Sequence, residues 1–117
     1  FFKDVNDRFG HQVGDEVLIQ ISKILQDNVR EIDTLWRWGG EEFLILCPHT
    51  KEEGIMSKAQ NLRKVLEEFS FEKIGHKTAS FGVTTYQKYD TEHTIINRAD
   101  KALYQAKDEG RNRVVFT

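Results

Sequence analysis

The chain has 117 residues, which is enough for one ordinary domain and too few for two. Charged residues make up 31% and hydrophobic residues 38%, a balance typical of globular proteins and not of disordered chains. The net charge of -2 argues against a general nucleic-acid-binding function. No run approaches the ~18 apolar residues of a membrane span, and the single Cys47 excludes an internal disulfide.

The first half of the chain predicts one helix followed by a β-hairpin. A polar, glycine-containing opening over residues 6–15 is interpreted as a loop. Apolar residues then recur at helical spacing from Val17 to Leu25. Two short aromatic or aliphatic runs, Thr34–Trp38 and Phe43–Cys47, flank a Gly-Gly turn and predict a hairpin.

The second half predicts two helices and two strands. A helix with an apolar stripe covers residues 55–69, and a β-rich strand covers residues 78–86. A third helix covers residues 92–108 and is ended by Gly110, before a last strand over residues 113–116. The order α-β-β-α-β-α-β predicts a single α/β (α+β) domain over residues 1–117, with a mostly antiparallel central sheet flanked by helices.

The hairpin turn carries the first residues suited to chemistry. Gly39 and Gly40 have no side chains, so a ligand can approach the backbone closely. Glu41 and Glu42 follow directly, and such carboxylates are hard oxygen donors suited to Mg²⁺ beside phosphates. Taken alone, the same four residues are also compatible with an acidic, solvated turn.

Two further segments could bind a nucleotide. Asn6 and Asp15 have side chains that can read the edge of a purine, the Asp accepting from N–H groups of guanine. Lys107 and Arg111 are four residues apart, and on one helical face they could hold a triphosphate. Two cations at a helix C-terminus are equally expected from the helix dipole alone.

Together the three segments resemble the motifs of GGDEF-domain diguanylate cyclases. The hairpin resembles the family signature in its Gly-Gly-Glu-Glu-Phe form, over residues 39–43. Residues 2–15 resemble the opening motif of the family, and residues 99–112 resemble its closing motif. Because the three motifs occur in order and cover nearly the whole chain, the sequence is identified as a member of this family. The resemblance implies a ferredoxin-like, palm-type cyclase fold whose first strand is truncated here.

The resemblance also implies a reaction. Two GTP-loaded domains face each other as a homodimer, and each 3′-hydroxyl attacks the α-phosphate of the opposite GTP, so that cyclic di-GMP forms and two pyrophosphates leave. Glu41 would coordinate Mg²⁺ or Mn²⁺, and Glu42 would lie beside the metal and the attacking hydroxyl, while Gly39 and Gly40 leave room for the nucleotide. Guanine would be bound by Asn6 and Asp15, and the phosphates by Lys107, Arg111, Lys3 and the backbone amides around Phe1 and Phe2.

A second site follows from the same resemblance. Arg30 and Asp33 precede Gly39 at the spacing of the RxxD inhibitory site of the family. There Arg30 would fork onto the guanine or phosphate of the product, and Asp33 would accept from guanine. Arg63, on the second predicted helix, is the candidate for the second arginine of such a site. Without the resemblance, an Arg and an Asp three residues apart would indicate only a surface ion pair.

Three functions remain open from the sequence: an active cyclase, a module that binds cyclic di-GMP or GTP without catalysis, and a dimerisation or regulatory output. The intact hairpin and guanine-reading residues favour the first. The chain begins after the position of a family Asp that ligates Mg²⁺, three residues before Phe1, so we expect weak or absent turnover from this fragment. We expect a longer parent protein with an upstream sensor or regulatory domain. The cyclase domain is expected in the cytoplasm, whether the parent is free or anchored in a membrane, and without a nucleic-acid partner.

Overall fold

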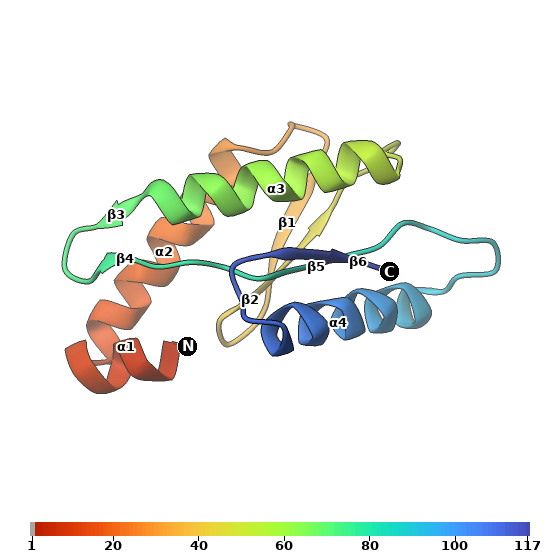
Figure 1. Ribbon diagram of the computed structural model, residues 1–117. Coiled ribbons are helices and arrows are strands. Elements are labelled where there is room, and N and C mark those ends of the chain that lie inside the picture. Colours follow the sequence, from red (N-terminus) through yellow and green to blue (C-terminus); the bar gives the residue numbers. More distant parts are fainter. Residues whose placement is uncertain (1) are drawn as a thin grey trace. The chain divides into compact units, whose positions relative to one another are not determined.

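The computed structural model describes residues 2–117, with side chains from Val5 onward (Figure 1). The chain divides into two units, each more densely connected within itself than to the other. Unit 1 contains the chain up to Pro48 together with Glu68–Lys77, and unit 2 contains His49–Glu67 and Thr78–Thr117. No helix within residues 2–117 combines the length and the apolar character needed to cross a bilayer.

Unit 1 begins with two helices joined by a sharp turn, coloured red to orange in Figure 1. Gly10 has a positive φ of 91°, a conformation that glycine adopts without strain, and its N–H donates to the Asn6 carbonyl at 2.8 Å. Val5 and Val17, from the two helices, are buried. The described elements of this unit are α1 (Phe2–Phe9), α2 (His11–Asp27), β1 (Thr34–Gly39), β2 (Glu42–Leu46), β3 (Ser70–Phe71) and β4 (Gly75–His76).

The prediction of a loop over residues 6–15 is wrong, because this segment is helical apart from the turn at Gly10. The glycines there suggested a loop, but only Gly10 has a positive φ. Gly14 lies within α2 and is buried. Glycine in this segment therefore marks one helix junction and one close contact, and not an irregular backbone.

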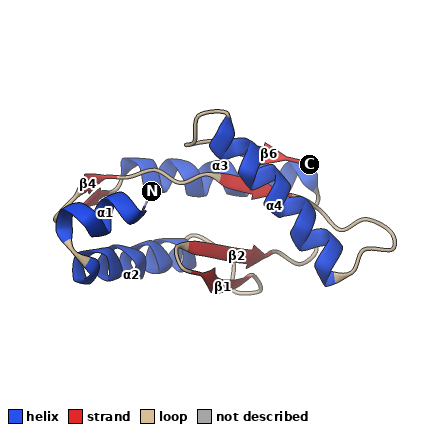
Figure 2. Cartoon of the chain, turned by 90° about the horizontal axis from the view of Figure 1, so that it is seen from below, coloured by secondary structure: helices blue, strands red, loops and turns tan. Residues whose placement is uncertain are grey.

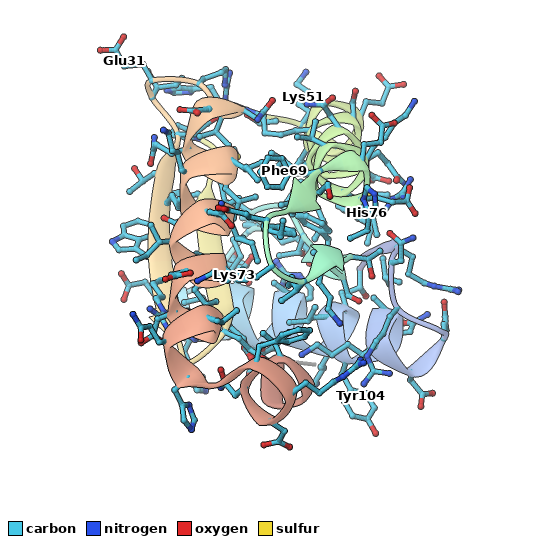
Figure 3. The ribbon with its side chains drawn as sticks, turned by 90° about the vertical axis from the view of Figure 1, so that its left-hand side faces the viewer. Glu31, Lys51, Phe69, Lys73, His76 and Tyr104 are labelled. Atoms are coloured by element: carbon cyan, nitrogen blue, oxygen red, sulfur yellow. The ribbon has the colours of Figure 1, made fainter. Side chains whose placement is uncertain are left out.

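The predicted hairpin is confirmed. β1 and β2 pair antiparallel with Thr34 opposite Leu46, and the register shifts between Arg37 and Gly39, so that Trp38 forms a bulge beside the turn. A second hairpin, β3–β4, was not predicted because two-residue strands are too short to show a periodicity. Its Lys73, labelled in Figure 3, forms an ion pair with Glu16 of α2 at 3.2 Å.

Unit 2 contains the remaining described elements, which are α3 (Glu52–Glu68, all but its last residue), β5 (Phe81–Val83), α4 (Glu92–Asp108) and β6 (Val114–Phe116). β5 and β6 pair in parallel, with Phe81 opposite Val114. A parallel pair needs a crossover connection, and α4 supplies it. The expected mostly antiparallel central sheet is not seen as one sheet: the described strands form three two-stranded ladders, two antiparallel and one parallel.

Helix α4 begins and ends as predicted. Thr91 and Thr94 form a reciprocal capping box at its start. At its end the Arg111 N–H donates to the Ala106 carbonyl at 3.0 Å and the Gly110 N–H to the Lys107 carbonyl at 3.4 Å, the two bonds of a Schellman motif. Gly110, with φ 126°, occupies the position in this motif that glycine favours.

The parallel ladder packs directly against α4 (Figure 2), and Gly82 of β5 faces the backbone of that helix. A Cβ atom placed on Gly82 would overlap the Ala99 carbonyl oxygen and the Leu103 amide nitrogen, and would lie 2.7 Å from the Leu103 Cα. Ala102 and Ala106 of α4 are buried. Small residues therefore let the helix backbone approach the strand closely.

A polar network holds the connection between β5 and α4. Arg98 donates to both carboxylate oxygens of Asp90, at 3.0 and 2.6 Å, and also to the Thr84 hydroxyl and the Thr85 carbonyl. The Asp90 carboxylate accepts further bonds from the Gln87 N–H and the Thr94 hydroxyl. The Arg98 guanidinium and these other donors hold the pKa of Asp90 well below its usual range.

We expect Asp90→Asn to lower the melting temperature by about 10 °C, because it removes the charge that pairs with the half-buried Arg98. The pKa of Asp90 is lower in the folded than in the unfolded chain. Its contribution is therefore complete above about pH 4 and is lost as the pH falls towards the folded-state pKa. Thermal melts at pH 7 and pH 3 check this, with Asp108→Asn on the exposed surface of α4 as the control. An equal loss at both pH values would contradict it.

Candidate functional site

The hairpin tip is open and tightly turned. Gly40 and Glu41 form the turn, and Gly39 pairs with Glu42 across it. Gly40 has a positive φ of 48°, and apart from each glycine and its chain neighbours no atom of the described residues lies within 4 Å of a Cβ placed on Gly39 or Gly40. The two glycines therefore leave space beside two consecutive carboxylates.

Arg37 clamps this turn, a feature that the sequence analysis missed. Its Nε and Nη2 both donate to the Gly40 carbonyl oxygen, at 2.8 and 2.6 Å. A fork of two charge-assisted bonds onto one carbonyl restricts the orientation of the turn. Arg37 thus positions the peptide that directly precedes Glu41, and no pattern in the sequence marks it for this role.

Glu41 and Glu42 are the candidates for holding a metal ion. Both are partly exposed. A pair of neighbouring carboxylates suits Mg²⁺, which is commonly held by one or two carboxylates and takes its other oxygen ligands from water and phosphates. Among the side chains that the structure describes, no group of three or more His, Cys, Asp or Glu residues gathers at one point.

The two residues predicted to read guanine lie on consecutive helices of unit 1. Asn6 lies in α1 and Asp15 in α2. The Asn6 side chain rests against Gly14, the residue directly before Asp15, since a Cβ on Gly14 would lie 3.0 Å from the Asn6 Cγ. The amide of Asn6 is therefore held beside the backbone that carries Asp15.

The predicted phosphate ligands are distributed over both units. Phe1 and the side chains of Phe2 and Lys3 lie outside the described residues. Lys107 lies in the last turn of α4, but the expectation that it shares a helical face with Arg111 is wrong. The helix ends at Asp108, and Arg111 follows the Schellman glycine in a left-handed conformation with φ 63°.

Arg30 and Asp33, predicted as an inhibitory site, bind each other. The Arg30 backbone N–H donates to Asp33 Oδ2 at 2.8 Å, and its guanidinium donates to Oδ1 at 3.0 Å and to the Pro48 carbonyl at 3.0 Å. The Asp33 side chain is fully buried, whereas the Arg30 side chain is 46% exposed. The hydrogen bond to Asp33 raises the pKa of the Arg30 guanidinium.

Arg63, the candidate for a second arginine, lies in unit 2 and is also engaged. It donates to the Asn112 side-chain oxygen at 3.1 Å and to Gln60 at 2.9 Å, and it pairs with Glu67 at 3.5 Å. Asn112 in turn donates to Glu67. Arg63 therefore joins α3 to the segment that follows α4.

Comparison with known proteins places these features in a family context. A family model described as "Diguanylate cyclase, GGDEF domain" matches residues 1–113. Diguanylate cyclase A of Treponema denticola is 43% identical over 122 residues, covering 100% of this chain and 33% of that protein. The chain therefore spans about a third of the length of this curated relative.

Solved structures agree in fold. The structure of the active GGEEF domain of a diguanylate cyclase from Vibrio cholerae has a TM-score of 0.90 and 38% identity, covering 98% of this chain and 75% of that one. The GGDEF domain of DgcB from Caulobacter crescentus, solved in complex with c-di-GMP, has a TM-score of 0.93 and 29% identity, covering 98% of this chain and 71% of that one. The mixed α/β arrangement thus matches these domains over nearly its whole length.

Proposed function

Because the chain belongs to the diguanylate cyclase GGDEF family, we propose that it condenses two GTP molecules into cyclic di-GMP with release of two pyrophosphates. The observation that carries this proposal is the hairpin tip, where Gly39 and Gly40 leave open space directly before Glu41 and Glu42. A nucleotide needs both features there, room for its phosphates and carboxylates for the accompanying metal.

The proposed fold is that of a palm-type, ferredoxin-like cyclase domain with a mostly antiparallel central sheet. The TM-scores of 0.90 and 0.93 to GGEEF and GGDEF domains support it. We place residues 1–117 as one such domain of a longer, cytoplasmic or membrane-anchored protein with an upstream sensor or regulatory domain. Catalysis then requires two copies, since each domain supplies one GTP.

Asn6 and Asp15 are proposed to select guanine. Guanine presents an N1–H and an N2 amine, which a carboxylate can accept from, whereas adenine has no N2 amine and no N1 proton. The contact of Asn6 with Gly14 supports this assignment, because it brings the amide next to the backbone of Asp15. ATP would leave the half-buried Asn6 amide and the exposed Asp15 carboxylate without their guanine partners and is therefore expected to bind more weakly.

Glu41 and Glu42 are proposed to hold Mg²⁺ or Mn²⁺. The ion would neutralise charge on the α-phosphate and lower the pKa of the attacking 3′-hydroxyl. Glu42 would also lie beside that hydroxyl, where its carboxylate can accept the proton. Arg37 keeps the turn in one orientation through the Gly40 carbonyl. The phosphates would be bound by Lys107, Arg111, Lys3 and the amides around Phe1 and Phe2.

The test is GTP turnover with Mg²⁺, with the products identified by mass, on both this chain and the longest protein in which it occurs. We expect cyclic di-GMP and pyrophosphate from GTP and not from ATP. A folded, dimeric protein that makes no product yet binds cyclic di-GMP would overturn the proposal in favour of a regulatory binding module.

We further propose feedback inhibition by cyclic di-GMP at Arg30 and Asp33, with Arg63 as a second arginine. The exposure of the Arg30 side chain supports this, because its guanidinium can donate to a phosphate or guanine acceptor. The bonds to Asp33 meanwhile hold the Arg30 backbone in place. The RxxD spacing before Gly39 is the sequence feature behind the proposal.

We expect Arg30→Ala to raise the concentration of cyclic di-GMP that halves the rate by at least roughly tenfold, since charge-assisted bonds are typically worth ~1.5–3 kcal/mol. The measurement is the ratio of rates with and without added product, taken separately for each variant. Lys64→Ala, which removes an exposed cation of α3, is the control. Unchanged inhibition in Arg30→Ala would show that the product acts elsewhere.

A further inference from the structure

Gly14 is a glycine in a place where the backbone does not require one. It lies inside α2 and is buried, and its φ is not among the positive values. Glycine is among the least favourable residues in a helix interior, because it loses the most conformational freedom on folding. A local reason for glycine must therefore come from what lies next to it.

What lies next to Gly14 is the side chain of Asn6. A Cβ on Gly14 would overlap the Asn6 Oδ1 and would lie 3.0 Å from its Cγ and 3.7 Å from its Nδ2. Outside the glycine, its chain neighbours and the backbone of its own helix, these are the three nearest atoms to that position. The volume that any other residue would fill with its Cβ is thus occupied by the carboxamide of Asn6.

We propose that Gly14 is a positioning residue for guanine selectivity, acting through Asn6. This inference rests on the proposed function, which assigns guanine binding to Asn6 and Asp15. By leaving out one methyl group, Gly14 lets the amide oxygen of Asn6 approach α2 closely, next to the residue that carries the second proposed guanine contact. The position of the amide is therefore set by the glycine and not by Asn6 alone.

An alanine at this position is accommodated by rotation of Asn6. The overlapping atoms belong to the end of a short side chain with two torsions, and staggered alternatives exist for it. The rotation moves the amide oxygen and nitrogen away from their hydrogen-bond directions, which weaken steeply with misalignment. Helix α2 itself becomes more stable, because alanine has a higher helix propensity than glycine. The variant is thus expected to fold well and to recognise guanine badly.

The experiment is a double-mutant cycle on the longest protein in which this chain occurs. Equilibrium binding of GTP, ITP and ATP with Mg²⁺ is measured for wild type, Gly14→Ala, Asn6→Ala and the double variant, together with melting temperatures. We expect Gly14→Ala to weaken GTP binding roughly tenfold with an unchanged or higher melting temperature. The double variant should bind GTP no more weakly than Asn6→Ala, because the methyl then has nothing to displace.

Gly54→Ala is the matched control. Gly54 also lies near the start of a helix, α3, and a Cβ there would lie 3.2 Å from the Thr50 Cγ2, away from any residue assigned to the nucleotide. This variant should leave GTP binding unchanged. It separates the effect of a glycine-to-alanine change in a helix from the effect on Asn6.

The outcomes distinguish this inference from the proposed function. A wild-type protein that does not prefer GTP to ATP overturns the proposed function itself. A GTP-selective wild type whose affinity survives Gly14→Ala, or losses that simply add in the double variant, overturns the role of Gly14. If Gly14→Ala unfolds, Asn6→Ala in the same chain should restore the fold, and failure to do so would show that the clash is not with Asn6.

Discussion

Glu41→Ala is expected to lower cyclic di-GMP production by at least about 100-fold, the largest effect on activity that the structure predicts. The carboxylate lies in the hairpin turn beside open space, and its neighbour Glu42 pairs with Gly39 in the ladder. Removing one of the two carboxylates proposed to hold the metal would weaken charge neutralisation at the transferred phosphate, and interactions of this kind are worth several kcal/mol. The measurement is kcat with saturating GTP over a range of Mg²⁺ concentrations.

Two further variants test whether the loss of activity comes from the charge of Glu41 in particular. Glu41→Gln keeps the shape of the side chain without its charge, so it should be nearly as inactive as alanine if charge is what matters. Glu72→Ala removes an exposed carboxylate from the β3–β4 hairpin of the same unit and should change little. Full activity of Glu41→Gln would exclude a metal-holding role for this residue.

Gly82→Ala is expected to destabilise the protein by about 3 kcal/mol, the upper end of what overpacking typically costs, and Gly82→Val by more. The added Cβ would overlap backbone atoms of Ala99 and Leu103, which cannot move aside as a side chain can. Strand β5 and helix α4 would have to separate, and overpacking of this kind typically costs 1–3 kcal/mol or more. Chemical denaturation followed by far-UV circular dichroism measures the loss.

Gly39→Ala is the control for this change. It also adds a methyl group to a strand glycine, but no atom lies within 4 Å of its Cβ position. Its free energy of unfolding should stay close to that of wild type. Equal stability of Gly82→Ala and Gly39→Ala would show that α4 does not depend on the close approach at Gly82.

Elements with strong local signals could be predicted from the sequence. The third predicted helix matches α4 at both ends, because Thr91 caps its start and Gly110 forms the Schellman turn at its end. The hairpin around Gly39 and Gly40 was likewise predictable from its glycines and flanking apolar runs. In each case the signal lies within a few residues of the feature.

The errors arose where distant contacts decide the structure. Gly14 suggested a loop, whereas its reason lies in the contact with Asn6 of another helix. Lys107 and Arg111 have helical spacing, but the backbone leaves the helix between them. Arg37 could not be recognised as the clamp of the turn without the position of the Gly40 carbonyl. The spacing of residues along the sequence does not by itself reveal these contacts.

The ion pair between Arg30 and Asp33 would affect the concentration of cyclic di-GMP at which the proposed feedback inhibition sets in. In a feedback site of the kind proposed, an incoming phosphate or guanine competes for Arg30 with a carboxylate that the chain already supplies at 3.0 Å. The ligand gains only the difference between the two partners, so the affinity is lower than that of an unpaired arginine. The internal competitor thereby raises the cellular product level at which synthesis would stop, and substitutions that loosen the pair would move that set point.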